Sequence, residues 1–179
     1  TNHLICTGNT VRNQSRYGIE AGSGSHQAYS HNVLTDNAVG MDVTSGASTR
    51  NLTISNNVIR RCYGAVNGDG IRLGNSLASG VTFSNVSIVG NTFDDILGNG
   101  TFIHLYGGAP KSDVIIGNNI CTIPAGTTGT VPRAIRLQDV TRAVISSNVV
   151  SVGVSRDQVQ VGAIHVDGAS DRIEVLNNV

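Results

Sequence analysis

Short apolar patterns recur along the whole chain, and none has the spacing of a helix. The clearest example is residues 49–74, TRNLTISNNVIRRCYGAVNGDGIRLG. Leu52 and Ile54 lead into an Asn pair there, and Ile71 and Leu73 alternate with Gly and Arg further on. Alternation with a period of two is typical of β-strands. This stretch therefore predicts extended segments joined by turns.

The same pattern repeats around one Asn, which identifies the chain as a series of repeats. Successive members of this Asn column are separated by 23, 25, 34, 28, 29 and 30 residues. The column is Asn9, Asn32, Asn57, Asn91, Asn119, Asn148 and Asn178. The second apolar pattern repeats as Ile19, Met41, Ile71, Ile103, Ile135 and Ile164. Both series predict positions that face a common core.

Repeats of this kind predict an all-β parallel β-helix, in which each turn of the chain adds one strand to each sheet. Successive coils lie about 4.8 Å apart, so like residues stack on like. We expect six full coils and the start of a seventh, forming one domain over residues 1–179. The Asn column should occupy a tight turn of left-handed backbone, with its side-chain amides bonded from coil to coil. Ligand binding by these Asn is the alternative.

Both ends of the sequence fall within a repeat. Residues 4–6 and 173–175 belong to core columns that have no partner beyond them. Solenoids normally carry polar caps over their terminal coils. The 179 residues are therefore expected to be an uncapped segment of a longer chain, or to pack at the ends against another molecule, as in a homotrimer.

Composition excludes several classes of partner. Lys and Arg together balance Asp and Glu, so the formal charge is zero and a nucleic-acid partner is not expected. No apolar run approaches the roughly 18 residues of a membrane span. Cys6 and Cys121 fall in apolar columns and are expected to be buried thiols. No cofactor or metal site is predicted; a calcium site at Asp94-Asp95 is the alternative, without supporting ligand spacing.

The repeated motif I-x-N-N-x-[IV] followed by G-I-x-L, present as ISNNVI and GDGIRL, resembles the parallel β-helix repeats of the pectate lyase-like superfamily. The resemblance covers essentially the whole chain. It implies a right-handed coil of three sheets, with the Asn between the second and third and G-I-x-L on the first. In such lyases, epimerases, polygalacturonases and phage tailspike depolymerases, sugar polymers usually bind along the outside of the first sheet. The predicted location is extracellular or on a virion surface.

Two catalytic signatures of that superfamily are absent from the sequence. Neither the Asp-Asp and Gly-His-Gly pattern of polygalacturonases nor the Asp-Pro-His-Glu pattern of alginate epimerases occurs. Candidate residues must therefore come from the predicted outer face itself.

Strand alternation predicts which residues line that face, because Arg72 must point outward if Ile71 and Leu73 point inward. The outward column is Glu20, Asp42, Arg72, His104, Arg136 and His165. The outward position before it is expected to hold Gly18, Gly40, Gly70, Phe102, Ala134 and Ala163. The outward position after it holds Gly22, Thr44, Gly74, Tyr106, Gln138 and Asp167. The small residues of the earlier column predict room for a ligand against the backbone.

Each charged group on this face also has a purely structural interpretation. Asp42 and Arg72, on adjacent coils, would form a cross-strand ion pair. His104 and His165 would simply be solvated. Asp69, like Asp139, lies at a turn edge and is interpreted as a turn residue.

Three functional hypotheses follow, and a polysaccharide lyase acting on an acidic polymer is favoured. Its catalytic residues would be His104, Arg136, Arg72 and Tyr106, with Arg holding a uronate carboxylate and His or Tyr removing the adjacent proton. Its substrate-binding residues would be Phe102, His165, Gln138, Asp167, Asp42 and Glu20. A glycoside hydrolase would instead use Glu20 and Asp42, whose spacing of about 5 Å approaches that of retaining glycosidases. The non-catalytic alternative is a shaft or receptor-binding segment of a phage tail spike, a fibre or a surface protein.

Overall fold

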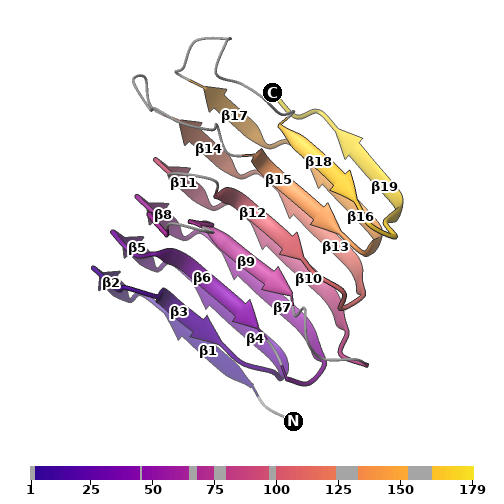
Figure 1. Ribbon diagram of the computed structural model, residues 1–179, viewed down its shortest axis with the longest axis horizontal. Coiled ribbons are helices and arrows are strands. Elements are labelled where there is room, and N and C mark those ends of the chain that lie inside the picture. Colours follow the sequence, from indigo (N-terminus) through magenta and orange to yellow (C-terminus); the bar gives the residue numbers. More distant parts are fainter. Residues whose placement is uncertain are drawn as a thin grey trace.

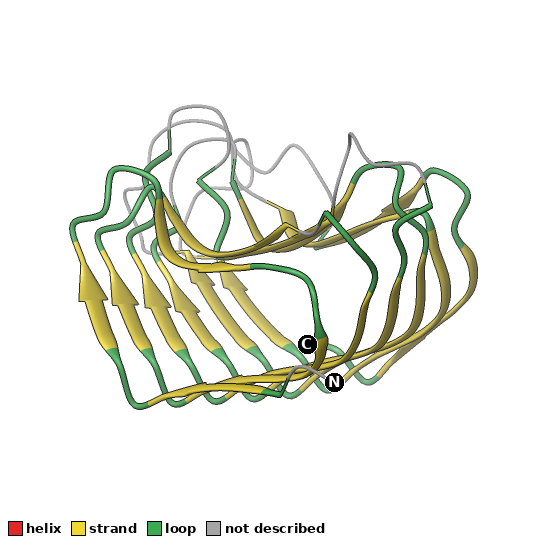
Figure 2. Cartoon of the chain, turned by 90° about the horizontal axis from the view of Figure 1, so that it is seen from below, coloured by secondary structure: helices red, strands yellow, loops and turns green. Residues whose placement is uncertain are grey.

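The computed structural model describes residues 3–44, 46–64, 68–74, 80–96, 100–123, 133–152 and 163–179. Within these ranges the regular secondary structure consists of strands, stacked in order from the N-terminal to the C-terminal end (Figure 1). The strands form three parallel sheets around a common interior (Figure 2). The predicted all-β parallel β-helix is therefore confirmed.

Sheet A contains seven strands and the other two sheets contain six each. Sheet A consists of β1 (Leu4–Thr7), β4 (Ser25–Ser30), β7 (Thr49–Ser55), β10 (Phe83–Val89), β13 (Lys111–Gly117), β16 (Val140–Ser146) and β19 (Asp171–Leu176). Sheet B consists of β2 (Thr10–Arg12), β5 (Val33–Thr35), β8 (Val58–Arg60), β11 (Thr92–Asp94), β14 (Ile120–Ile123) and β17 (Val149–Val152). Sheet C consists of β3 (Tyr17–Ala21), β6 (Val39–Thr44), β9 (Ile71–Gly74), β12 (Thr101–Tyr106), β15 (Arg133–Gln138) and β18 (Ile164–Asp167).

The core is built from the aligned apolar columns. In the coil that begins with β7, five core residues are fully buried. They are Leu52 and Ile54 of sheet A, Ile59 of sheet B, and Ile71 and Leu73 of sheet C. Their partners on adjacent strands stand in the same columns, so each sheet contributes stripes of apolar side chains to the interior. Burial of these stripes supplies the main favourable term in folding.

The Asn column forms the predicted hydrogen-bonded ladder between sheets A and B. Each Asn donates from Nδ2 to Oδ1 of the next, at 2.8–3.1 Å along the whole column. Backbone N–H groups of the same residues donate to the same oxygens, as Asn57 does to Asn91 at 3.0 Å. Because the middle members are buried, the ladder satisfies polar groups that would otherwise be costly inside the turn.

The left-handed backbone lies one residue earlier than the sequence pattern suggested. Positive φ angles belong to the residues just before the ladder, including His31 (56°), Asn56 (54°) and Asn118 (54°), and not to Asn57. The preceding residue makes the turn, which leaves the ladder Asn free to direct its amide along the stack. Asn therefore suits this column because of its side-chain amide, and not because it tolerates a left-handed backbone.

One predicted outward column in fact points into the core. Phe102 is fully buried and its ring meets that of Phe93 edge-on, with centroids 5.9 Å apart. A Cβ added to Gly40 would lie 2.5 Å from Ile59 Cγ2, and one added to Gly70 would lie 2.7 Å from Phe93 Cδ1. Alternation fails at the start of the sheet C strands, where two successive residues face inward. The glycines therefore make room for core side chains such as Ile59 and Phe93. They do not leave space for a ligand on the outer face.

Strands, and no cap, occupy the described parts of both ends. Leu4 in β1 and Val175 in β19 belong to core columns yet are 44% and 49% exposed.

Cys62 and Cys121 are buried, and burial raises the pKa of each thiol to about 12. No helix in the described ranges is long and apolar enough to cross a membrane.

Candidate acid–base site on the outer face of sheet C

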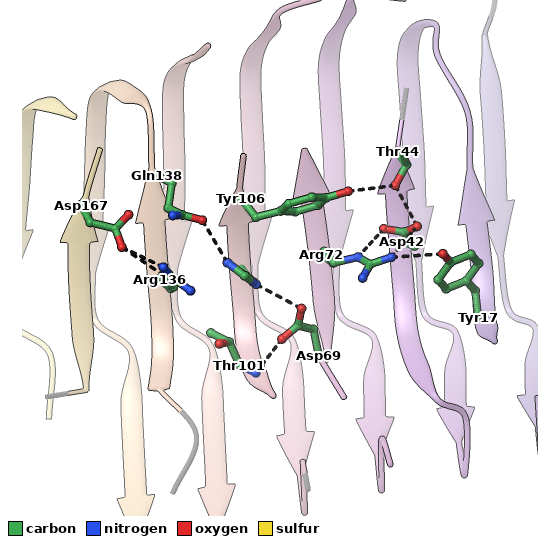
Figure 3. Close-up of polar contacts among 11 residues, drawn as sticks. Tyr17, Asp42, Thr44, Asp69, Arg72, Thr101, Tyr106, Arg136, Gln138 and Asp167 are labelled. Carbon is green, nitrogen blue, oxygen red and sulfur yellow. Dashed lines mark hydrogen bonds and ion pairs between the residues drawn. The ribbon is translucent and has the colours of Figure 1, made fainter. Parts of the chain in front are cut away.

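Sheet C aligns the predicted outward column from one coil to the next. The register pairs Glu20 with Asp42, Asp42 with Arg72, Arg72 with His104, His104 with Arg136, and Arg136 with His165. The second predicted column is aligned beside it, with Thr44 opposite Gly74, Gly74 opposite Tyr106, and Gln138 opposite Asp167. These two columns form the outer face on which the candidate site lies (Figure 3).

His104 occupies the middle of this face and is held by a buried carboxylate. Its Nδ1 lies 3.1 Å from Oδ2 of Asp69, which precedes β9 on the previous coil. The other oxygen of Asp69 accepts the backbone N–H of Thr101 at 2.7 Å. Asp69 is 1% exposed and His104 is 9% exposed. A carboxylate fixed in this way orients the imidazole.

The second imidazole nitrogen faces a side-chain amide. Nε2 of His104 lies 3.4 Å from Oε1 of Gln138 on the following coil. A protonated imidazole donates to this oxygen, whereas a neutral imidazole protonated on Nδ1 accepts at Nε2 from the amide NH₂ after a half-turn of the Gln138 amide. Gln138 can therefore serve both protonation states, which suits a group that takes up and releases a proton.

Tyr106 lies beside the imidazole and links it to a second polar cluster. The two ring centroids are 5.6 Å apart. The Tyr106 hydroxyl is 3.4 Å from Oγ1 of Thr44, and the Arg72 guanidinium lies 5.3 Å from the Tyr106 ring centroid. The candidate residues Tyr106 and His104 are thus neighbours, with the Arg72 cation over the phenol ring.

Arg72 is committed to Asp42. Its Nε and one Nη donate to the two oxygens of Asp42 at 2.9 and 3.1 Å, and the same Nη donates to the Tyr17 hydroxyl at 3.1 Å. Thr44 donates a further hydrogen bond to Asp42 at 2.8 Å. Burial opposes the charge on Arg72, but the hydrogen bond and charge of Asp42 more than offset it and raise the pKa of Arg72. The structural interpretation, a cross-strand ion pair, describes this pair.

Arg136 is paired less completely. Its Nε and one Nη both donate to Oδ2 of Asp167, at 3.2 and 3.0 Å. Nε2 of His165 lies 3.5 Å from the same oxygen. The Oδ1 atom of Asp167 is buried and has no hydrogen-bond partner among the described residues. About a quarter of the Arg136 side chain is exposed, so this guanidinium is the more accessible of the two.

The structure places the remaining predicted residues apart from this centre. Glu20 is exposed at the edge of the face, next to Asp42, whose carboxylate is turned to Arg72. Phe102 is in the core and contributes nothing to the outer surface. In the described part of the chain no group of three or more His, Cys, Asp or Glu side chains could hold a metal ion.

Asp69 and Tyr17 are the important members of the site that strand alternation missed. Asp69 was interpreted as a turn residue because it stands between two glycines in GDG, directly before the strand. Its contact with His104 depends on the break in side-chain alternation at the start of the strand. A strict period of two does not predict that break. A carboxylate one coil away from an outward His was the only available signal.

Comparisons with known proteins add no relative to this description. No protein-family model, curated protein or solved structure matches the chain.

Proposed function

We propose that this protein is a carbohydrate-active β-helix whose outer sheet C face binds and cleaves an extended polysaccharide, with His104 as the proton-transferring group. The supporting observation is the Asp69–His104 pair on the outer face of sheet C, in which a fully buried carboxylate holds the imidazole. A solvated surface histidine needs no buried carboxylate behind it. General acid–base catalysis needs an oriented imidazole whose second nitrogen can reach a proton.

A β-elimination fits the groups around His104. In an acidic polymer, Nε2 would take the proton beside the uronate carboxylate, and the electron pair left behind would form a carbon–carbon double bond. The adjacent glycosidic C–O bond then breaks, and its oxygen receives a proton from Tyr106. Arg136 would face the carboxylate and offset the charge that develops during proton removal. Arg72 would act indirectly, through Tyr106, because Asp42 occupies its guanidinium.

The hydrolytic alternative has weaker support. It requires both Glu20 and Asp42 to act on one glycosidic bond, one as a protonated acid that donates to the leaving oxygen and the other as an ionised nucleophile. Asp42 is 1% exposed and forms a two-point ion pair with Arg72, which occupies both of its carboxylate oxygens. The acidic pair is therefore better explained by the structure of the sheet than by catalysis.

A non-catalytic shaft is the second candidate, and one observation favours it. The two Arg side chains of the face have counterions on the same face, in the pairs Asp42–Arg72 and Arg136–Asp167, and the Asp69 carboxylate is hydrogen-bonded to His104. Internal pairing of this kind is also expected of a face that only needs to be soluble and stable. The experiment must therefore distinguish catalysis from simple stability.

The test is cleavage of pectin, alginate and bacterial capsule preparations, followed by the absorbance of unsaturated products and by released reducing ends. His104→Asn should lower kcat by about 10²–10⁴-fold, the usual contribution of a general base. His26→Asn is the matched control, because His26 lies in sheet A, and it should leave the rate unchanged. Reducing ends without unsaturated products would replace the lyase by a hydrolase. If the parent cleaves none of these polymers, or if cleavage survives His104→Asn, the shaft replaces the enzyme.

A further inference from the structure

Lys111, the one lysine in the sequence, is fully buried at the start of β13. Its ammonium donates to three backbone carbonyls, those of Gly107 at 2.9 Å, Ala109 at 2.7 Å and Gln138 at 3.0 Å. An ammonium has three N–H donors and no acceptor, so this set of carbonyls satisfies it completely. Burial lowers the pKa of Lys111 to about 8, with the charge of Asp139 acting in the opposite direction. The ammonium is therefore still protonated at neutral pH.

The fold itself does not require a cation at this position. In sheet A the register partners of Lys111 are Phe83 on one side and Val140 on the other, and both are fully buried. Apolar side chains thus fill the same column on the neighbouring coils. Burying an ammonium here costs desolvation that an apolar side chain would avoid. The charge calls for an explanation beyond core packing.

Two of the three carbonyls lie in one turn, and the third lies at the end of a strand that is followed by a shorter turn. Residues 107–110 connect Tyr106 of β12 to β13, whereas Asp139 alone connects Gln138 of β15 to β16. Turns of unequal length on adjacent coils cannot pair residue for residue, and the backbone pairing resumes where the Lys111 N–H donates to the Asp139 carbonyl at 3.0 Å. The Lys111 ammonium joins the longer turn to the end of the next strand.

We propose that Lys111 is a positioning residue for the site on sheet C. It fixes the backbone at Gln138 and the turn that follows Tyr106, and thereby sets how these two side chains meet the His104 imidazole. This inference rests on the proposed function for its catalytic consequence, but its structural part does not. The Gln138 carbonyl is held by Lys111 while the Gln138 side chain lies against Nε2 of His104. The turn carbonyl of Gly107 belongs to the residue directly after Tyr106.

The first measurement needs no substrate. The imidazole ¹⁵N shifts of His104, assigned by their loss in His104→Asn, report its tautomer and its hydrogen bonds. Lys111→Met keeps the side-chain length and removes all three donors, and it should change both shifts of His104 while leaving those of His26 and His31 unchanged. Asn57→Ala is the control for general destabilisation, because it lies in the Asn ladder, away from sheet C, and should leave the His104 shifts unchanged.

The second measurement is activity on any polymer that the parent cleaves. Lys111→Met should lower kcat by up to about 100-fold with little change in KM, the effect of a displaced catalytic group. Lys111→Gln retains two N–H donors and should recover part of that loss. Unchanged His104 shifts in folded Lys111→Met overturn the proposal. So does failure of both Lys111 variants to fold, since the role would then be structural alone. A parent without activity refutes the proposed function, while the His104 shifts still decide whether Lys111 positions the residues around His104.

Discussion

Three buried titratable side chains give the folded state opposing responses to alkaline pH. Between about 8 and its ordinary value of 10.5, Lys111 is protonated in the unfolded chain and not in the folded protein, so this group raises stability as pH rises. Cys62 and Cys121 keep their protons up to about 12 in the folded protein and lose them from 9 upward when unfolded. The thiols therefore lower stability as pH rises above 9.

The contribution of Lys111 is isolated by comparing the parent with Lys111→Met, in which the thiols are unchanged. As pH rises from about 8 to 10.5, the parent should gain on the order of 3 kcal/mol in unfolding free energy relative to the variant. Urea denaturation of both proteins at several pH values measures the difference. A difference that stays constant across this range would show that Lys111 does not change its protonation there.

The Asn ladder makes a second prediction for single residues. Asn57 is buried, donates to Asn91 and to the Tyr29 carbonyl, and accepts from Asn32. Asn57→Ala removes all of these hydrogen bonds and leaves their buried partners unpaired. It should lower the unfolding free energy by on the order of 1–3 kcal/mol. Asn9→Ala is the matched control, because Asn9 is exposed at the end of the ladder and water can replace its amide. Equal losses of unfolding free energy in the two variants would show that burial does not increase what an Asn of the ladder contributes to stability.

The elements of this fold were predictable where the period-two pattern is complete. The inward pairs such as Ile71 and Leu73 follow from alternation, and the Asn ladder follows from the repeat of one Asn in every coil. The prediction failed at the start of the sheet C strands, where Gly70 and Phe102 turn inward and Asp69 turns outward to His104. A reversal of one residue depends on contacts with neighbouring coils, and the sequence of one repeat does not contain those contacts.

That reversal can be tested at Gly70, in the segment leading into β9. A Cβ there would lie 2.7 Å from the Phe102 carbonyl oxygen and 2.7 Å from Phe93 Cδ1. Gly70→Ala should therefore lower the unfolding free energy by roughly 1–3 kcal/mol, the usual cost of overpacking. Gly22→Ala is the control, since a Cβ at Gly22 meets nothing within 4 Å. If the two variants have equal melting temperatures, the Gly70 position does not face the core.

For the whole molecule, the stacked architecture makes each coil depend on its immediate neighbours. Strands in the middle, such as β7 and β10, have a hydrogen-bonded partner on both sides, whereas β1 and β19 have one. Stability in such a solenoid is approximately a sum of coil and interface terms, so opening should proceed inward from the ends. The site on sheet C lies between β6 and β18, which places His104 in the more stable interior of the stack.

Amide hydrogen exchange measures this gradient directly. Protection should be greatest in β7, β8, β10 and β11 and should decline toward β1 and β19, where core residues Leu4 and Val175 are already half exposed. Asn57→Ala should reduce protection most in the two coils that flank it, because the ladder it interrupts joins those coils. Equal protection of all strands, falling equally everywhere in the variant, would mean that the solenoid opens as one cooperative unit and that coil-by-coil additivity does not hold.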